Sequence, residues 1–174
     1  MRKRILVPVD FSDASSLAVT HAVELAGRLG AELILLHVVE PVYYPVAGDL
    51  YGLDPEFGNV YDAVERTARQ QLAKLTTRVR ARHAATRELL VLGTAYRSIV
   101  AQAKRLRADL IVMSTHGRSG LSHALLGSVA ERVVRLAPCP VLTVPARGVK
   151  RARSGHLRLV GEPKRRGKRR AASA

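Results

Sequence analysis

The stretch LIVMSTHGRSGLSHALLGS, from Leu110 to Ser128, is the part of the sequence that decides the predicted fold. Its first four residues form an apolar run of the kind typical of a buried strand. A loop rich in glycine and serine follows, and the next segment, SVAERVVRLA (128–137), has apolar residues at helical spacing. A buried strand that leads through a glycine-rich loop into a helix is typical of an α/β protein.

The same alternation extends outward from this stretch over most of the chain. Strands are predicted at Arg4–Asp10, Ala31–Val39, Glu88–Gly93, Asp109–Ser114 and Pro140–Pro145. Helices are predicted from the FSDASS segment to Leu29, and over Asp62–His83, Ile99–Leu106 and Ser128–Ala137, with a loop over Glu40–Gly58. This order predicts an α/β fold: an open five-stranded parallel sheet with helices on both faces, in a Rossmann-like arrangement.

Charge is spread unevenly along the 174 residues, whose formal net charge is +15. Eleven of the 29 basic residues, but only one acidic residue, Glu162, lie after Ala146. We therefore expect one folded domain over 1–146 and a basic, disordered tail over 147–174. Such a tail either binds nucleic acid nonspecifically through its charge or only keeps the protein in solution, and the sequence leaves both open.

The sequence also bears on compartment and on metal binding. No apolar run approaches the roughly 18 residues of a membrane span. The start, MRKRILVPVD, has the basic end of a signal peptide, but its apolar part stops at Asp10 and is too short. We therefore expect a cytoplasmic protein, and the single cysteine, Cys139, fits a reducing compartment. The six histidines lack metal-ligand spacing, so no metal site is predicted.

Polar residues follow two of the predicted strands. Asp10 ends the first strand, and Ser114–Gly117 ends the fourth. If these strands are neighbours, both features face one crevice, where ligands bind in open parallel sheets. Gly127 and Ser128 begin the next helix, where free amides favour phosphate. Together these residues predict a phosphate cradle, although the P-loop and the dinucleotide GxGxxG pattern are absent. The hydrolase GxSxG pattern is absent too, which weakens a hydrolase interpretation.

These residues carry a resemblance to the universal stress proteins of the nucleotide-binding kind, over Arg4 to Val144. It rests on ILVPVDFS, LLHVV, ADLIVMSTHGRSGLSHALLGSVAE and PCPVLTVP. The family's ATP motif is glycine, two residues, glycine, nine residues, glycine and then serine or threonine. Here Ser114 stands at the first glycine, Gly117 matches the second, and Gly127–Ser128 complete the motif.

The resemblance implies an adenine nucleotide alpha hydrolase-like fold in which the first and fourth strands are neighbours. It implies ATP as the ligand, with Mg²⁺ carried in by it, and a homodimer formed through Val141–Val144. Asp10 would accept hydrogen bonds from the nucleoside part, and the phosphates would meet the glycines of the motif. The implied site residues are Pro8, Val9, Asp10, Val38, Met113, Ser114, Gly117, Gly127, Ser128 and Val129.

The predicted function is therefore an ATP-binding stress-response protein that acts as a dimeric, nucleotide-dependent regulatory or protective module. No catalytic residue is predicted, and turnover would be slow or absent. One rival is an ATP-independent dimerisation or interaction module of the same fold. The other is a nucleic-acid binder that works through the basic tail.

Two residues of the predicted site have open alternatives. A left-handed backbone at Ser114 would cost roughly 1–2 kcal/mol and weaken binding about tenfold. An extended backbone there would cost little and leave the hydroxyl as a donor. Asp10 either contacts the nucleoside or only caps the first helix.

Overall fold

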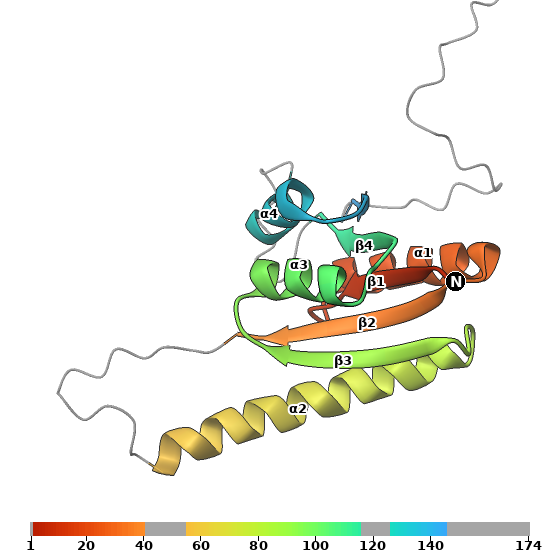
Figure 1. Ribbon diagram of the computed structural model, residues 1–174. Helices are drawn as coiled ribbons and strands as arrows, with labels where there is room; N and C mark the ends of the chain where they lie inside the picture. The colour runs from red at the N-terminus through yellow and green to blue at the C-terminus, as the bar shows by residue number, and fades with distance from the viewer. Residues whose placement is uncertain (1, 41–54, 116–125, 146–174) are drawn as a thin grey trace, which may run out of the picture.

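The structure is a computed structural model that describes residues 2–40, 55–115 and 126–145, with side chains from residue 62 onward in the second range. Strands and helices alternate strictly along the chain (Figure 1). The strands are β1 (Arg4–Pro8), β2 (Glu32–Val39), β3 (Thr86–Leu92), β4 (Leu110–Ser114) and β5 (Val141–Val144). The helices are α1 (Asp13–Leu29), α2 (Pro55–Arg80), α3 (Ala95–Arg105) and α4 (Ser128–Leu136).

The five strands form one parallel sheet in the order β3-β2-β1-β4-β5. Ile5 in β1 pairs with Leu33 on one side and with Leu110 on the other, so β1 and β4 are neighbours. The chain builds outward from β1 to β3 and then returns to the other side of β1. That reversal opens a crevice at the carboxyl ends of β1 and β4.

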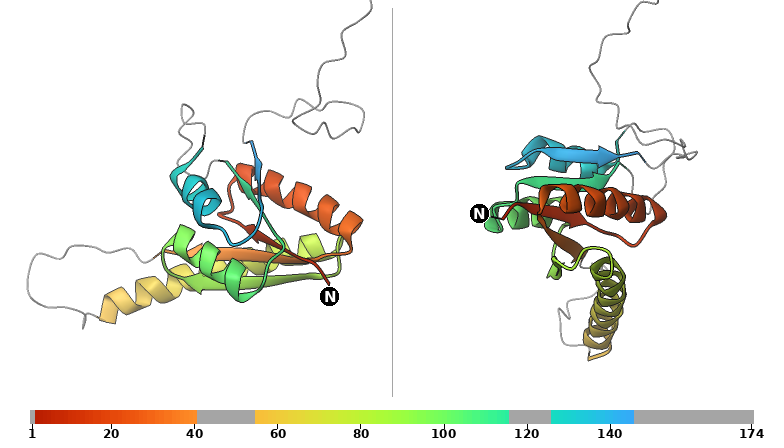
Figure 2. Two further views of the ribbon diagram at one scale, coloured as in Figure 1. Left: turned by 45° about the horizontal axis from the view of Figure 1, so that its top comes forward. Right: turned by 90° about the vertical axis from the view of Figure 1, so that its right-hand side faces the viewer.

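Two hydrophobic cores, one on each face of the sheet, explain why the central strands are mostly apolar. On one face the first core packs against α1 and α2, with Val7, Leu35 and Val112 buried beneath them. On the other face Leu6 and Ile111 pack against α3 and α4. Figure 2 shows these two helical layers on either side of the sheet. The predicted fold class, an open five-stranded parallel sheet covered on both faces, is confirmed.

Helix α1 shows how local sequence sets the element boundaries. Ser12 is its N-cap and its side chain accepts a hydrogen bond from the amide of Ser15. Gly30 ends the helix in a left-handed conformation, with φ 60°, which suits a residue without a Cβ atom. Both ends agree with the sequence pattern.

The predicted starts of two helices are wrong. Helix α2 begins at Pro55 rather than Asp62, so it takes in the end of the stretch predicted as loop. Proline is well suited to the first turn of a helix because its missing N–H has no partner there. Helix α3 begins at Ala95 rather than Ile99, and its first amide donates to the side chain of Glu40, 55 residues earlier.

Two further predictions concern the chain as a whole. The predicted boundary between residues 146 and 147, together with the basic tail, lies outside the described residues. None of the helices within the three described ranges is both long enough and apolar enough to cross a bilayer.

Candidate functional site

A cavity of about 1030 Å³ opens at the carboxyl end of the sheet. The ends of β1, β2 and β4 form its base, and the first turns of α3 and α4 and one side of α2 form its walls. The cavity therefore lies at the point where the strand order reverses. This is the place where open α/β sheets bind ligands.

Nine of the ten predicted site residues line this cavity. They are Pro8, Val9, Asp10, Val38, Met113, Ser114, Gly127, Ser128 and Val129. The tenth, Gly117, lies outside the described residues, as do His116 and Arg118 of the same loop. Four separate segments of the chain thus contribute the predicted residues to one hollow.

Asp10 is tied to the start of α1. Its Oδ1 accepts hydrogen bonds from the Ser12 amide at 3.0 Å and from the Ser12 hydroxyl at 2.6 Å. The Ser12 hydroxyl in turn accepts from the Ser15 amide at 3.2 Å. The carboxylate therefore braces the first helix, which is the structural role that the sequence left open, and it does so from a half-buried position on the cavity wall.

Phe11 and His37 line the cavity as well, although the sequence analysis did not single them out. The centroid of the Phe11 ring lies 4.4 Å from that of His37. His37 Nδ1 donates to the carbonyl of Val9 at 2.7 Å, and the Val9 amide donates to the carbonyl of Leu36 at 2.8 Å. A carbonyl only accepts, so Nδ1 carries the proton. Both the amide and the carbonyl of Val9 are thus bonded to β2, which fixes the chain just after β1.

The sequence contains a signal for His37 but hides the one for Phe11. His37 is a polar residue within the apolar run LILLHVV, which marks it as unusual for a buried strand. Phe11 has a left-handed backbone, with φ 64°. Such a conformation in a bulky residue is rare, concentrates at functional sites and is not visible in the sequence pattern.

Ser114 has an ordinary extended backbone. It is the last residue of β4 and pairs with Val144 in β5. Among the non-glycine residues that the structure describes, only Phe11 and Arg107 have positive φ. The serine at the first motif position therefore carries no left-handed strain, which decides between the two alternatives for this residue.

Three helices begin around the cavity, and they differ in what satisfies their first amides. Helix α1 has the hydroxyl of Ser12, and α3 has the carboxylate of Glu40, whose Oε1 accepts from the Ala95 amide at 2.7 Å. Helix α4 starts after Gly127, and no described side chain caps it. Among these three helices, α4 is therefore the one whose first turn could hold an anion.

A short backbone bond fixes where this open helix start lies. The Gly127 amide donates to the carbonyl of Thr115 at 2.7 Å, and the Thr115 amide donates to the carbonyl of Val144 at 2.9 Å. The first turn of α4 is thereby held beside the end of β4. Asp10 lies two residues beyond the end of the neighbouring strand β1, so its carboxylate and the first turn of α4 share one crevice.

Charge in the lining complements this arrangement. Asp10 and Glu40 are the acidic residues of the described lining, which contains no lysine or arginine. An anionic group in the cavity would thus be held by main-chain amides and by the Ser128 hydroxyl rather than by ion pairs. The arrangement suits a ligand with an anionic end and a hydroxyl-bearing end.

Cys139 lies outside the cavity lining and packs partly against the second core. Burial, followed by the nearby Asp109 carboxylate, raises the pKa of the Cys139 thiol. A thiol with a raised pKa is less often ionised and therefore less reactive near neutral pH. Cys139 is therefore a small packing residue at the border of the second core.

Comparisons with known proteins agree with the fold. The model of the universal stress protein family matches residues 1–145. A universal stress protein of Methanocaldococcus jannaschii is 34% identical over 144 residues, which cover 82% of this chain and 81% of that protein.

Solved structures give the same result. The universal stress protein UspA from Lactobacillus plantarum is 31% identical with a TM-score of 0.72, covering 83% of this chain and 99% of its own. A universal stress protein in complex with cAMP is 27% identical with a TM-score of 0.54, covering 82% and 95%. Because the family model spans most of the sequence, this chain belongs to the universal stress protein family.

Proposed function

We propose that this chain binds an adenine nucleotide, ATP foremost, in the cavity at the carboxyl end of the sheet, and acts in the stress response through its nucleotide-bound state. The observation that carries the proposal is the uncapped start of α4 in the same cavity as Asp10. Support also comes from the related universal stress protein whose structure contains cAMP. Mg²⁺ would enter with the phosphates.

The two ends of the cavity differ chemically, and this difference supports one orientation of the nucleotide. The phosphates would meet the first amides of α4 at Ser128 and Val129, where the helix dipole favours negative charge. Gly127 would lie against them without donating, because its amide is bonded to the carbonyl of Thr115. The resemblance to the family's motif implies Gly117 beside them. The nucleoside would lie against the strand ends, with Asp10 accepting from its hydroxyl groups and Pro8, Val9, Val38, Met113 and Ser114 around it.

Isothermal titration calorimetry with ATP, ADP and AMP tests this assignment. Asp10→Ala is expected to lose about 1.5–3 kcal/mol of binding free energy, the range for hydrogen bonds to a charged group. Asp10→Asn is the matched control, because its amide oxygen still accepts from the Ser12 amide and hydroxyl. It should keep the thermal midpoint of the wild type but bind nucleotide more weakly. Unchanged affinity in both variants would refute the role of Asp10.

The alternative of an ATP-independent module has its own test. Mass spectrometry of gently purified protein should find a copurifying adenine nucleotide. If no nucleotide copurifies and calorimetry detects no binding, the ATP-independent alternative replaces this proposal.

We also propose that the chain forms a homodimer through β5. This strand lies at the edge of the sheet, where one row of backbone groups has no neighbouring strand among the described residues. Leu142 in β5 and Val134 and Leu136 in α4 are exposed apolar side chains beside that edge. Leu142→Glu should convert the dimer to a monomer in sedimentation experiments. A wild-type monomer at micromolar concentration would contradict the proposal.

A further inference from the structure

The end of the sheet opposite the cavity, where the strands begin, is strongly basic. A parallel α/β fold brings the last turns of the helices to the amino ends of the strands. The segments that meet there are 2–4, 28–32, 78–87 and 104–109, and together they form what we name the basic end. Its basic residues are Arg2, Lys3, Arg4, Arg28, Arg78, Arg80, Arg82, Arg87, Lys104, Arg105 and Arg107.

The charge of the described residues is therefore segregated. The basic end contains these eleven basic residues and two acidic ones, Glu32 and Asp109. Elsewhere, the described ranges contain nine acidic residues and six basic ones. Helix dipoles favour the five basic residues in the last turns of α1, α2 and α3. The other six basic residues of this end lie outside those turns.

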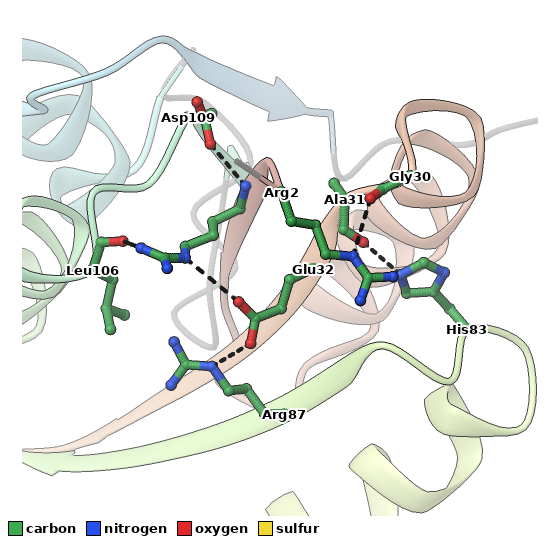
Figure 3. Close-up of polar contacts among 9 residues, drawn as sticks. Arg2, Gly30, Ala31, Glu32, His83, Arg87, Leu106 and Asp109 are labelled. Carbon is green, nitrogen blue, oxygen red and sulfur yellow. Dashed lines mark hydrogen bonds and ion pairs between the residues drawn. The ribbon is translucent and has the colours of Figure 1, made fainter.

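Hydrogen bonds join the four segments into one surface, on the right in Figure 1 (Figure 3). Arg2 Nε donates to the carbonyl of Gly30 at 3.2 Å, and His83 Nε2 donates to that of Ala31 at 2.8 Å. Arg4 Nη1 donates to the carbonyl of Leu106 at 2.7 Å. Residues from four distant parts of the sequence are thus fixed next to one another.

Both acidic residues of the basic end are already engaged. Glu32 pairs with Arg87 at 2.7 Å and with Arg4 at 3.6 Å. Asp109 Oδ2 accepts from the amide of Arg4 at 2.8 Å. Six exposed basic side chains make no ion pair or side-chain hydrogen bond within the described part of the chain: Lys3, Arg28, Arg78, Arg82, Lys104 and Arg107.

Arg107 is an independent sign that charge at this end has a use. Helices α1 and α3 are each followed by one left-handed residue, Gly30 with φ 60° and Arg107 with φ 48°. Glycine adopts this conformation without strain, whereas an arginine does not. The chain thus has an exposed arginine with a strained backbone at a position where a glycine would stabilise the helix end. Strain of this kind points to a functional side chain.

We propose that the basic end binds the phosphate backbone of double-stranded nucleic acid without reading its sequence. Nine of its eleven basic residues are arginines, whose planar guanidinium groups match phosphate. Its segments contain no phenylalanine, tyrosine or tryptophan on which single-stranded bases could stack, and the ring of His83 is bonded to the carbonyl of Ala31. Leu29 is their one exposed large apolar residue among the described ones, which is little for insertion into a lipid surface.

The test is fluorescence anisotropy of the full-length chain on a labelled duplex of about 20 base pairs, from about 50 to about 200 mM salt. The variant Arg28→Gln, Arg82→Gln, Arg107→Gly removes three charges from the basic end. We expect it to bind at least tenfold more weakly and to reduce the salt slope by up to about 2.7, since each phosphate contact contributes about 0.9. The matched control, Arg66→Gln, Arg69→Gln, Arg132→Gln, removes the same charge from other surfaces.

The control and two further measurements decide the outcome. The proposal holds if the control variant binds like the wild type and the basic-end variant does not. Equal affinities in all three proteins overturn it and assign binding to residues 147–174, and equal losses in both variants overturn it as a net-charge effect. Loss of binding to phosphatidylserine vesicles with unchanged duplex binding assigns the surface to lipid instead. Arg107→Gly alone should keep or raise the thermal midpoint, so weaker binding cannot reflect unfolding.

Discussion

At the scale of single residues, Ser114 is where this chain departs from its family's motif. The extended backbone of this residue accommodates a Cβ atom, because Ser114 is part of β4 and pairs with Val144. We predict that Ser114→Gly changes nucleotide affinity less than threefold, while glycine in a strand costs about 0.5–1 kcal/mol of stability. Calorimetry and chemical denaturation measure the two effects. A tenfold gain in affinity would show that the serine obstructs the ligand.

Thr76 is a residue whose chemistry works against its position. It is 1% exposed within α2, and its hydroxyl has no hydrogen-bond partner in the described part of the chain. Burying an unsatisfied hydroxyl is unfavourable, and valine has nearly the same shape. We predict that Thr76→Val raises the free energy of unfolding by about 1 kcal/mol, measured by urea denaturation.

A matched variant separates polarity from packing at this position. Thr76→Ser keeps the hydroxyl and removes a methyl group, so it should lower stability by about 1 kcal/mol. If both variants destabilise the protein equally, the hydroxyl is satisfied in solution and the prediction for valine is wrong.

At the scale of elements, the strands could be predicted from the sequence and two helix starts could not. The runs ILVP, LILLHVV and LIVM are continuously apolar because both faces of each strand are buried, so sequence and burial are the same signal. The start of α3 depends on Glu40, which is distant in sequence and reaches it only through the folded sheet. Local patterns contain no information about such a contact.

The capping contact from Glu40 gives a prediction for α3. The N-cap residue Thr94 makes no side-chain cap bond, so Glu40 supplies the acceptor for the Ala95 amide at 2.7 Å. Glu40→Ala should destabilise the protein by about 1 kcal/mol, as loss of an N-cap does. Glu40→Gln keeps an oxygen acceptor and loses the charge, so it should fall between the two in thermal denaturation. An unchanged midpoint for the alanine variant would mean that water replaces the carboxylate at no cost.

The candidate site was predictable to the extent that it follows the motif and the strand ends. Asp10, Ser114 and Gly127 end or follow predicted elements, and the topology then brings them together. Phe11 and His37 were missed because their importance lies in a left-handed turn and a cross-strand hydrogen bond. Both features are properties of the folded backbone. A strand pattern records burial, and it does not record which polar group a neighbouring strand presents.

At the scale of the whole molecule, one topological fact produces two chemically opposite ends. Parallel strands joined by helices place the helix N-termini at the carboxyl ends of the strands and the helix C-termini at their amino ends. The carboxyl end of the sheet presents the first turn of α4, which no described side chain caps, in one cavity with acidic side chains. The amino end of the sheet presents basic side chains next to helix carboxyl ends. The two proposed ligands, a nucleotide and a duplex, would therefore bind at opposite ends of the sheet.

This separation predicts that the two ligands bind independently. The longest strand described, β2, has eight residues, so the amino and carboxyl ends of the sheet lie about 25 Å apart at about 3.3 Å per residue. That distance is about three Debye lengths at 0.15 M salt, where the screening length is about 8 Å, so direct repulsion between the bound anions is weak. Duplex affinity should change less than twofold when ATP is saturating at that salt concentration. Asp10→Ala is the control, because ATP should leave its duplex binding unchanged as well. If ATP displaces the duplex from the wild type but not from Asp10→Ala, the two ends of the sheet are coupled through the fold. If ATP displaces the duplex from both proteins, ATP itself binds to the basic end.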